Sequence, residues 1–215
     1  MPSTPAEGPR PPEPFRSASR QSAQPFDDPE LFKVLASLRD YGALGEASLP
    51  QAVEHAEAFV AALPHPCSRL IDLGSGGGLP GLVLAMRLED CQITLTDRRE
   101  RRADLLSRAC HRLGIDHRVE VIVGDVVDLG KQARYQGSFD AVTARSFGPP
   151  LHTLRCAAPF LSSDGVVVIS EPPGEADQTR WPAEQLREVG FHVGDQLFPR
   201  VKQLRFRGGG AAHPA

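Results

Sequence analysis

The stretch Ile71-Asp72-Leu73-Gly74-Ser75-Gly76-Gly77-Gly78-Leu79-Pro80-Gly81 lies between an apolar run and a segment with helical spacing. Glycines permit a sharp turn and let the backbone lie close to a ligand, because no Cβ intervenes. A helix that begins directly after the turn offers free N–H groups and a partial positive charge. Pro80 suits the first helical turn, where its missing N–H costs nothing. The stretch therefore predicts a strand, a ligand-binding turn and a helix.

Two cofactor classes use a turn of this kind. Gly76, Gly78 and Gly81 satisfy the dinucleotide pattern, in which the helix receives a pyrophosphate. Asp72 followed by Gly74, Gly76 and Gly78 satisfies the S-adenosylmethionine pattern, in which the loop holds an amino-acid portion. A carboxylate before the turn would repel a pyrophosphate but attracts an ammonium group. The sequence therefore favours S-adenosylmethionine as the cofactor.

Candidate cofactor-binding residues also lie at the ends of the next apolar runs. Asp97 ends the second run, where an acid can accept hydrogen bonds from ribose hydroxyls. Asp125 ends the third and is followed by Val126 and Val127, a pattern that suits the edge and the face of an adenine. An ordinary role in a turn or a helix cap stays open for Asp97 and Asp125. Arg145 follows the fourth run.

From residue 69 onward, short apolar runs alternate with helical patterns. The runs are rich in Val and Ile with little alternation, as in strands that are covered on both faces. Strand–helix repetition predicts a parallel, doubly wound α/β sheet with right-handed crossovers. The C-terminal part of the chain differs from this pattern, because its apolar runs predict an antiparallel hairpin. We expect strands at 69–73, 91–96, 119–123, 139–144 and 166–170, helices at 79–88, 98–113, 150–161 and 182–189, and hairpin strands at 191–198 and 201–207.

The chain of 215 residues predicts one domain with tails. Eight of the twenty prolines fall in residues 1–29, so we expect a disordered tail there and a flexible tail at 208–215. The domain, 30–207, would comprise N-terminal helices at 30–66 and an α/β core at 69–207. Asp28 can cap the first helix with Pro29 at its first position, and Ser48 can begin the second.

Composition narrows the class of protein. No run of about 18 apolar residues is present, and no apolar segment typical of a secretory signal, so we expect a cytoplasmic protein without a membrane span. The four cysteines lie far apart and the seven histidines lack ligand spacing, which predicts reduced thiols and no metal site. A net charge of −3 excludes a uniformly basic nucleic-acid coat.

The motif from Asp72 to Gly81, together with Thr96-Asp97 and Ala144-Arg145-Ser146-Phe147, resembles the ribosomal RNA small-subunit methyltransferase G family, also called the glucose-inhibited division protein B family. Members of that family are class I methyltransferases that methylate N7 of one guanine in bacterial 16S rRNA. The resemblance covers about residues 31–207 and is densest from 69 to 148. It implies the class I Rossmann-like fold, S-adenosylmethionine as cofactor and 16S rRNA or the small ribosomal subunit as partner.

The resemblance also implies residue roles. Gly74 and Leu79 would contact the cofactor, and Val126 and Val127 would flank its adenine. Arg145 would lie at the junction of cofactor and substrate, where we expect it to orient the cofactor carboxylate or the guanine. His55 matches a histidine of the family's N-terminal helices.

Two alternatives remain on the same scaffold. A small-molecule methyltransferase would suit Glu171 and the acidic net charge, and a non-catalytic protein could bind S-adenosylmethionine and act through partners. Phe147 can stack on a base or belong to the core. The basic residues are equally consistent with a solvated surface and with an RNA contact; they are Arg98, Arg99, Arg101, Arg102, Arg108, Arg112 and Arg118, and near the end Arg200, Lys202, Arg205 and Arg207.

Overall fold

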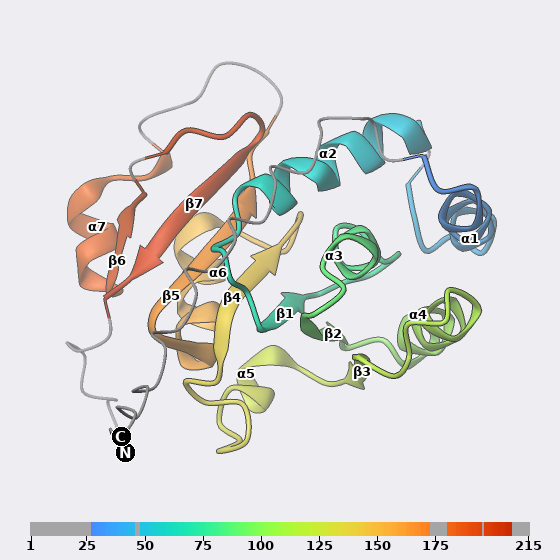
Figure 1. Cartoon of the computed structure of the whole chain (residues 1–215). Coiled ribbons are helices and arrows are strands. Elements are labelled where there is room, and N and C mark those ends of the chain that lie inside the picture. The colour runs from blue at the N-terminus through green and yellow to red at the C-terminus, as the bar shows by residue number, and fades with distance from the viewer. Residues whose placement is uncertain (1–26, 46–47, 173–179, 195, 208–215) are drawn as a thin grey trace, which may run out of the picture.

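A computed structural model describes residues 27–45, 48–172, 180–194 and 196–207. These residues form a seven-stranded sheet in the order β3-β2-β1-β4-β5-β7-β6 (Figure 1). The first five strands pair in parallel, whereas β7 runs antiparallel to both β5 and β6. The strands are β1 (Arg69–Leu73), β2 (Gln92–Asp97), β3 (Val119–Val123), β4 (Phe139–Ala144), β5 (Leu161–Ser170), β6 (Phe191–Val193) and β7 (Val201–Phe206).

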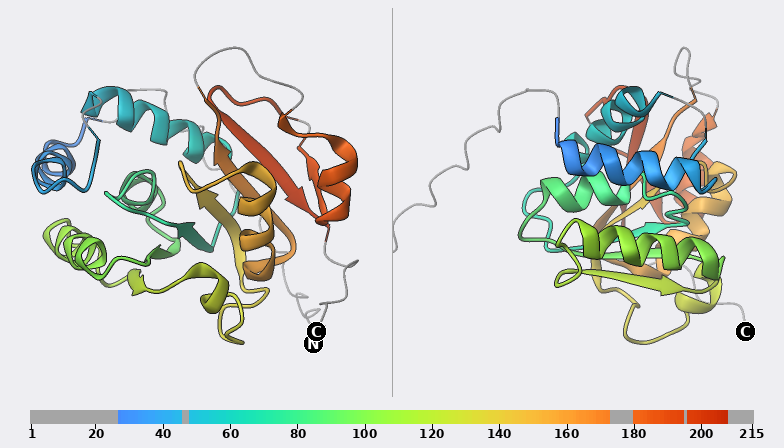
Figure 2. Two further views of the ribbon diagram at one scale, coloured as in Figure 1. Left: turned by 180° about the vertical axis from the view of Figure 1, so that it is seen from behind. Right: turned by 90° about the vertical axis from the view of Figure 1, so that its right-hand side faces the viewer.

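Helices cover both faces of the sheet, as the continuous apolar strands require. Successive strand residues point to opposite faces, so Leu70 packs in one core and Ile71 in the other. Figure 2 shows the layer of α1 to α4 facing the viewer in its right panel. One layer holds α1 (Pro29–Asp40), α2 (Leu49–Ala61), α3 (Gly81–Arg87) and α4 (Glu100–Arg112); the other holds α5 (Val126–Leu129), α6 (Pro150–Ala157), the 3-10 helix η1 (Ala158–Phe160) and α7 (Ala183–Glu188).

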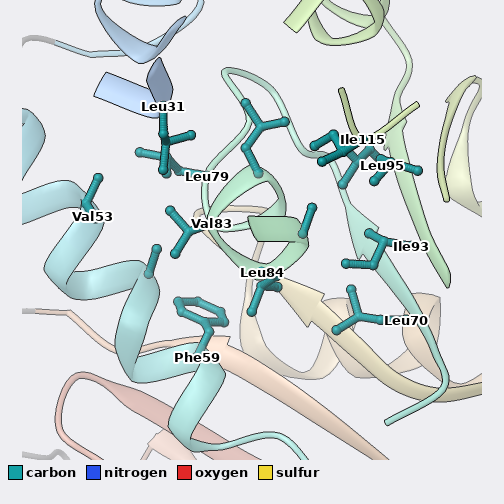
Figure 3. Packing of buried hydrophobic residues seen from close by; sticks show 14 of the residues in the cluster. Leu31, Val53, Phe59, Leu70, Leu79, Val83, Leu84, Ile93, Leu95 and Ile115 are labelled. Carbon is teal, nitrogen blue, oxygen red and sulfur yellow. The ribbon is translucent and has the colours of Figure 1, made fainter. Parts of the chain in front are cut away.

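The N-terminal helices are an integral part of the first core. Asp28 caps α1, with its Oδ1 accepting a hydrogen bond of 2.9 Å from the Leu31 N–H. Leu31 of α1 and Phe59 of α2 then point toward α3, where Val83 and Leu84 meet them (Figure 3). Because α3 is enclosed by α1, α2 and the sheet, the turn that precedes it is backed by packed side chains.

Most expected elements are confirmed, and the exceptions have local causes. α5 was not predicted, because four residues are too few to show a helical period. The expected helix at 150–161 ends at Ala157, two residues before Pro159, and continues as η1. β5 begins at Leu161 instead of residue 166, since its pairing with β4 shifts register between Phe139 and Ala141. β6 ends at Val193 instead of residue 198.

Residues 1–26 and 208–215, where we expected tails, lie outside the described residues. Within the described part of the chain, no helix is long and apolar enough to cross a membrane.

The strand order determines where a ligand can bind. The chain builds β1, β2 and β3 outward in one direction and then places β4 and β5 on the other side of β1. In open α/β sheets, ligands bind outside the carboxyl ends of the strands at this reversal point. The glycine-rich turn follows β1 and therefore lies at that point.

Candidate functional site

The glycine-rich turn is attached to the end of β2. The Ser75 N–H donates to the Thr96 carbonyl oxygen at 2.7 Å, and the Thr96 hydroxyl donates to the Asp72 carbonyl oxygen at 2.9 Å. The Gly76 N–H donates to Oδ2 of Asp97 at 3.0 Å. Thr96 and Asp97 thus supply partners for the polar groups of the turn.

Two of the glycines serve different purposes. Gly74 has a φ of +66°, and a Cβ there would lie 3.0 Å from the Phe147 ring. Gly78 has a φ of +88°, and a Cβ there would lie 2.5 Å from Leu82. Gly74 is thus needed at the wall of a pocket, whereas Gly78 is needed for close packing of the turn on α3.

A pocket of about 390 Å³ opens at the carboxyl ends of β1 to β4. It brings together five of the predicted site residues, namely Gly74, Asp97, Asp125, Val126 and Val127. The other five, Asp72, Gly76, Gly78, Leu79 and Arg145, are not among the residues that line this pocket. The remaining lining residues are Arg98, Arg99, Arg102, Gly124, Ser146, Phe147, His152 and Cys156.

Asp97 and Asp125 hold the backbone in place and also line the pocket. Oδ1 of Asp97 accepts a hydrogen bond from the Arg99 N–H at 2.8 Å, in addition to the bond that Oδ2 accepts from Gly76. Oδ1 of Asp125 accepts from the Val127 N–H at 2.9 Å and caps α5. A carboxylate oxygen has two lone pairs, so both groups can still accept from a ligand hydroxyl or amine.

Asp72 and Arg145 lie beside the pocket as groups of opposite charge, with Asp72 buried and Arg145 half-buried. Asp72 is 1% exposed, its Oδ1 accepts a 2.6 Å hydrogen bond from Thr143, and burial raises its pKa to about 6. Burial lowers the pKa of Arg145, and the Asp72 charge opposes that effect. Among the described residues, neither Oδ2 of Asp72 nor Nη1 of Arg145 has a hydrogen-bond partner. Nη1 of Arg145 therefore has unused donor capacity, whereas Oδ2 of Asp72 faces the Gly81 backbone at the start of α3.

The side chain of Leu79 belongs to the core. It is 5% exposed and points toward Leu31 of α1, close to Val83 (Figure 3). Its apolar side chain turns toward the N-terminal helices, because they leave an apolar space over α3. The expected contact between Leu79 and the cofactor stays a prediction, and this packing leaves the backbone of the turn for that role.

The sequence prediction missed one wall of the pocket. His152 of α6 lies with its ring 6.1 Å from that of Phe147, at an interplanar angle of 10°. Cys156 follows one helical turn later, with its Sγ 3.7 Å from the Nε2 of His152. The spacing of four residues after the Gly148-Pro149-Pro150 turn was the available signal, because it places both side chains on one face of a helix.

The arginines between residues 98 and 118 have different roles in the fold. Arg98, Arg99 and Arg102 line the pocket. Arg112 lies 3.7 Å from Glu30 of α1, and Arg118 donates to the Ala85 and Leu88 carbonyl oxygens. The pocket wall is thus basic on the α4 side.

Glu171 and His55 are engaged in contacts within the fold. Oε1 of Glu171 accepts a 2.7 Å hydrogen bond from the Trp181 indole and lies 3.8 Å from Nε of Arg180. Nε2 of His55 lies 3.2 Å from the Arg200 carbonyl oxygen, and burial lowers the pKa of His55. Among the described residues, no group of three or more His, Cys, Asp or Glu side chains could hold a metal ion.

Comparison with known proteins gives the site a context. A family model described as rRNA small subunit methyltransferase G matches residues 35–188. The protein of that name from Sorangium cellulosum is 35% identical over 137 residues, which are 64% of this chain and 54% of the relative. The one from Kineococcus radiotolerans is 34% identical over 130 residues, 60% of this chain and 50% of the relative. The chain spans about half the length of the curated relatives it matches.

Solved structures agree on the fold. A methyltransferase from Geobacter sulfurreducens has a TM-score of 0.62 at 15% identity, covering 86% of this chain and 93% of its own. The O-methyltransferase from Bacillus cereus in complex with SAH has a TM-score of 0.60 at 15% identity, covering 84% and 92%. The sheet order and these similarities establish the class I methyltransferase fold.

Proposed function

Because the chain belongs to the rRNA small subunit methyltransferase G family, we propose that it transfers a methyl group from S-adenosylmethionine to N7 of a guanine in 16S rRNA. The observation that carries the proposal is the pocket that gathers Gly74, Asp97 and Asp125 at the ends of three neighbouring strands. The proposed substrate implies a cytoplasmic location.

The residues fit the cofactor. Oδ2 of Asp72 and Nη1 of Arg145, which lack partners in the described residues, match the ammonium and the carboxylate of an amino acid. When bound, S-adenosylmethionine would supply an electrophilic methyl group on its sulfonium. In this arrangement Asp72 and Arg145 hold the amino-acid portion beside the glycine-rich turn.

The pocket offers suitable partners for the nucleoside portion. The Asp97 carboxylate accepts from the ribose hydroxyls, and Gly74 lets the backbone lie close to the ligand. Asp125 accepts from the amine at the adenine edge, while Val126 and Val127 contact the adenine face. Val127 is 51% exposed, so a flat apolar ligand would cover surface that otherwise faces water.

The reaction needs alignment more than proton transfer. Guanine N7 carries a lone pair and no proton, so no general base is required. Positioning of two reactants can supply roughly 7–11 kcal/mol of the barrier. The nearly parallel rings of Phe147 and His152 offer the guanine a stacking surface at the pocket wall. Arg145 lies two residues before Phe147, and in this proposal it orients the guanine or the cofactor carboxylate.

The basic wall favours RNA over a small molecule. Arg98, Arg99 and Arg102 can contact phosphates next to the pocket. Glu171, which suited a small-molecule substrate, is instead satisfied by Trp181 and Arg180. Its charge is used within the fold and gives no support to the small-molecule alternative.

The proposal is tested by transfer of a tritiated methyl group to purified small subunits that lack the modification, with fully modified subunits as the control. We expect label in one guanine of 16S rRNA in the first case and background in the second. Equal labelling of both preparations, or labelling of no guanine N7, would contradict the substrate. Tight binding of S-adenosylhomocysteine without turnover on any subunit would favour the non-catalytic alternative.

A further inference from the structure

Two thiols meet at the amino ends of β1 and β2, at the opposite end of these strands from the pocket. Cys67 lies two residues before β1 and Cys91 directly before β2. Their Sγ atoms are 4.0 Å apart, and the Cys91 thiol donates toward the Cys67 sulfur. The two strands are parallel neighbours, and the Gln92 N–H donates to the Ser68 carbonyl oxygen at 2.8 Å at this end. Sheet pairing thus holds the two sulfurs close together although the residues are 24 positions apart.

The two sulfurs differ in access and charge. Cys91 is 1% exposed, whereas Cys67 is half-buried and reaches the surface. The hydrogen bond with Cys67 lowers the pKa of Cys91 and raises that of Cys67, because the pair holds one negative charge more readily than two. The Arg118 guanidinium also favours the Cys91 thiolate, while Asp140 opposes it. A thiolate shared between two close sulfurs is the reactive form toward oxidants.

We propose that Cys67 and Cys91 form an oxidisable dithiol, which a hydroperoxide converts into an intramolecular disulfide. When the Cys91 thiol donates its proton toward Cys67, the shared negative charge lies on the half-buried Cys67 sulfur, which attacks one peroxide oxygen. The O–O bond breaks, and with one proton from solvent a sulfenic acid and water result. The Cys91 sulfur then attacks the Cys67 sulfur, and the S–O bond breaks with release of a second water. Two thiols lose two electrons and two protons, and one hydroperoxide is reduced. The proposal does not depend on the methyltransferase function.

Formation of the disulfide needs only a small movement of the two cysteine side chains. A disulfide has an S–S distance of about 2.05 Å, so the sulfurs must approach by roughly 2 Å. We expect rotation about the Cα–Cβ bonds to supply this approach. Cys110 and Cys156 lie in α4 and α6 and are buried there. They serve as internal controls.

The cross-link would close the segment from β1 to β2, which contains the glycine-rich turn and α3. Closing a loop of this length restricts the unfolded chain and thereby stabilises the fold. The pocket lies at the other end of β1, which rises about 16 Å over its five residues. We therefore expect greater thermal stability with little change in ligand binding.

The test treats the full chain with hydrogen peroxide, blocks the remaining thiols under denaturing conditions and maps the cysteines by mass spectrometry. We expect a Cys67–Cys91 linked peptide in monomeric protein, with Cys110 and Cys156 still alkylated. The melting temperature should rise by roughly 5–10 °C and return on addition of a thiol reductant. Cys67→Ser, a change at the half-buried position, should abolish both effects, whereas Cys110→Ala should retain them.

Cys91→Ala provides a second variant in which the buried sulfur is removed. If it folds, it should form a stable sulfenic acid at Cys67, which a dimedone probe detects. Three results would overturn the proposal: disulfide links between two chains, oxidation of Cys110 or Cys156 before the pair, or an unchanged melting temperature despite complete linkage.

Discussion

The hydroxyl of Thr143 in β4 donates a 2.6 Å hydrogen bond to Oδ1 of Asp72 in β1, and Oδ2 of that carboxylate is left without a partner among the described residues. The bond fixes the carboxylate across the central strand pair. The fold therefore sets the orientation of Asp72, and its Oδ2 faces Gly81 at the start of α3.

This arrangement predicts a pH dependence of cofactor binding. Burial raises the pKa of Asp72 to about 6, so the carboxyl is charged above this pH and neutral below it. Only the charged form attracts an ammonium group, so affinity for S-adenosylhomocysteine should fall as the pH drops below about 6, by roughly tenfold per unit. Calorimetry between about pH 5 and pH 8 measures this. Asp72→Asn can keep an acceptor for Thr143 and should give weak binding that varies little with pH.

Arg145 should affect turnover more than folding. Arg145→Ala removes a guanidinium whose Nη1 lacks a partner among the residues described, so little stability is lost. Misplacement of the reactants should lower kcat on the order of 100-fold. Arg145→Lys keeps the charge without the planar fork and should recover part of the activity. Methyl transfer at the native rate by Arg145→Ala, with an unchanged melting temperature, would refute the proposed role.

Gly78 should be intolerant of a side chain for reasons of packing. A Cβ would lie 2.5 Å from Leu82 at a φ of +88°, so Gly78→Ala should destabilise the fold by about 2–4 kcal/mol. Gly114 has a similar φ of +67° and nothing within 4 Å of its Cβ position. Gly114→Ala should cost only about 1 kcal/mol. Equal losses in urea unfolding would show that backbone strain alone acts at both sites.

Phe147 should contribute to the RNA substrate more than to the cofactor. Its ring lies parallel to that of His152 at the pocket wall, and stacking on a base is worth about 1–3 kcal/mol. Phe147→Ala should therefore lower kcat/KM for small subunits by roughly 5- to 150-fold, while Phe147→Tyr keeps the stacking surface. Affinity for S-adenosylhomocysteine is the control measurement. A loss confined to cofactor affinity would place the ring in the cofactor site instead.

Much of the fold could be predicted because its signals are local. Uninterrupted apolar runs indicate strands that are covered on both faces, and Asp28 followed by Pro29 marks a helix start. The four-residue α5 escaped prediction, since a helix of one turn has no period to detect.

The site was predicted in part. Gly74 and Asp125 follow strands and Asp97 ends one. The carboxyl ends of parallel strands lie together, so the convergence of these residues in the pocket follows from their order along the chain. His152 and Leu79 could not be placed in this way. Whether a side chain on a helix or turn faces the pocket or the core depends on which neighbour packs against it.

The sequence by itself determined the strand–turn–helix unit, the cofactor class it favours and the alternation of strands and helices. These depend on backbone freedom, charge and hydrophobic period within short segments. Only the tertiary structure decided that Thr143 orients Asp72, that Trp181 and Arg180 satisfy Glu171, and that Cys67 meets Cys91. The physical reason is distance along the chain: Asp72 and Thr143 are 71 positions apart, and only sheet pairing brings such groups within hydrogen-bond reach.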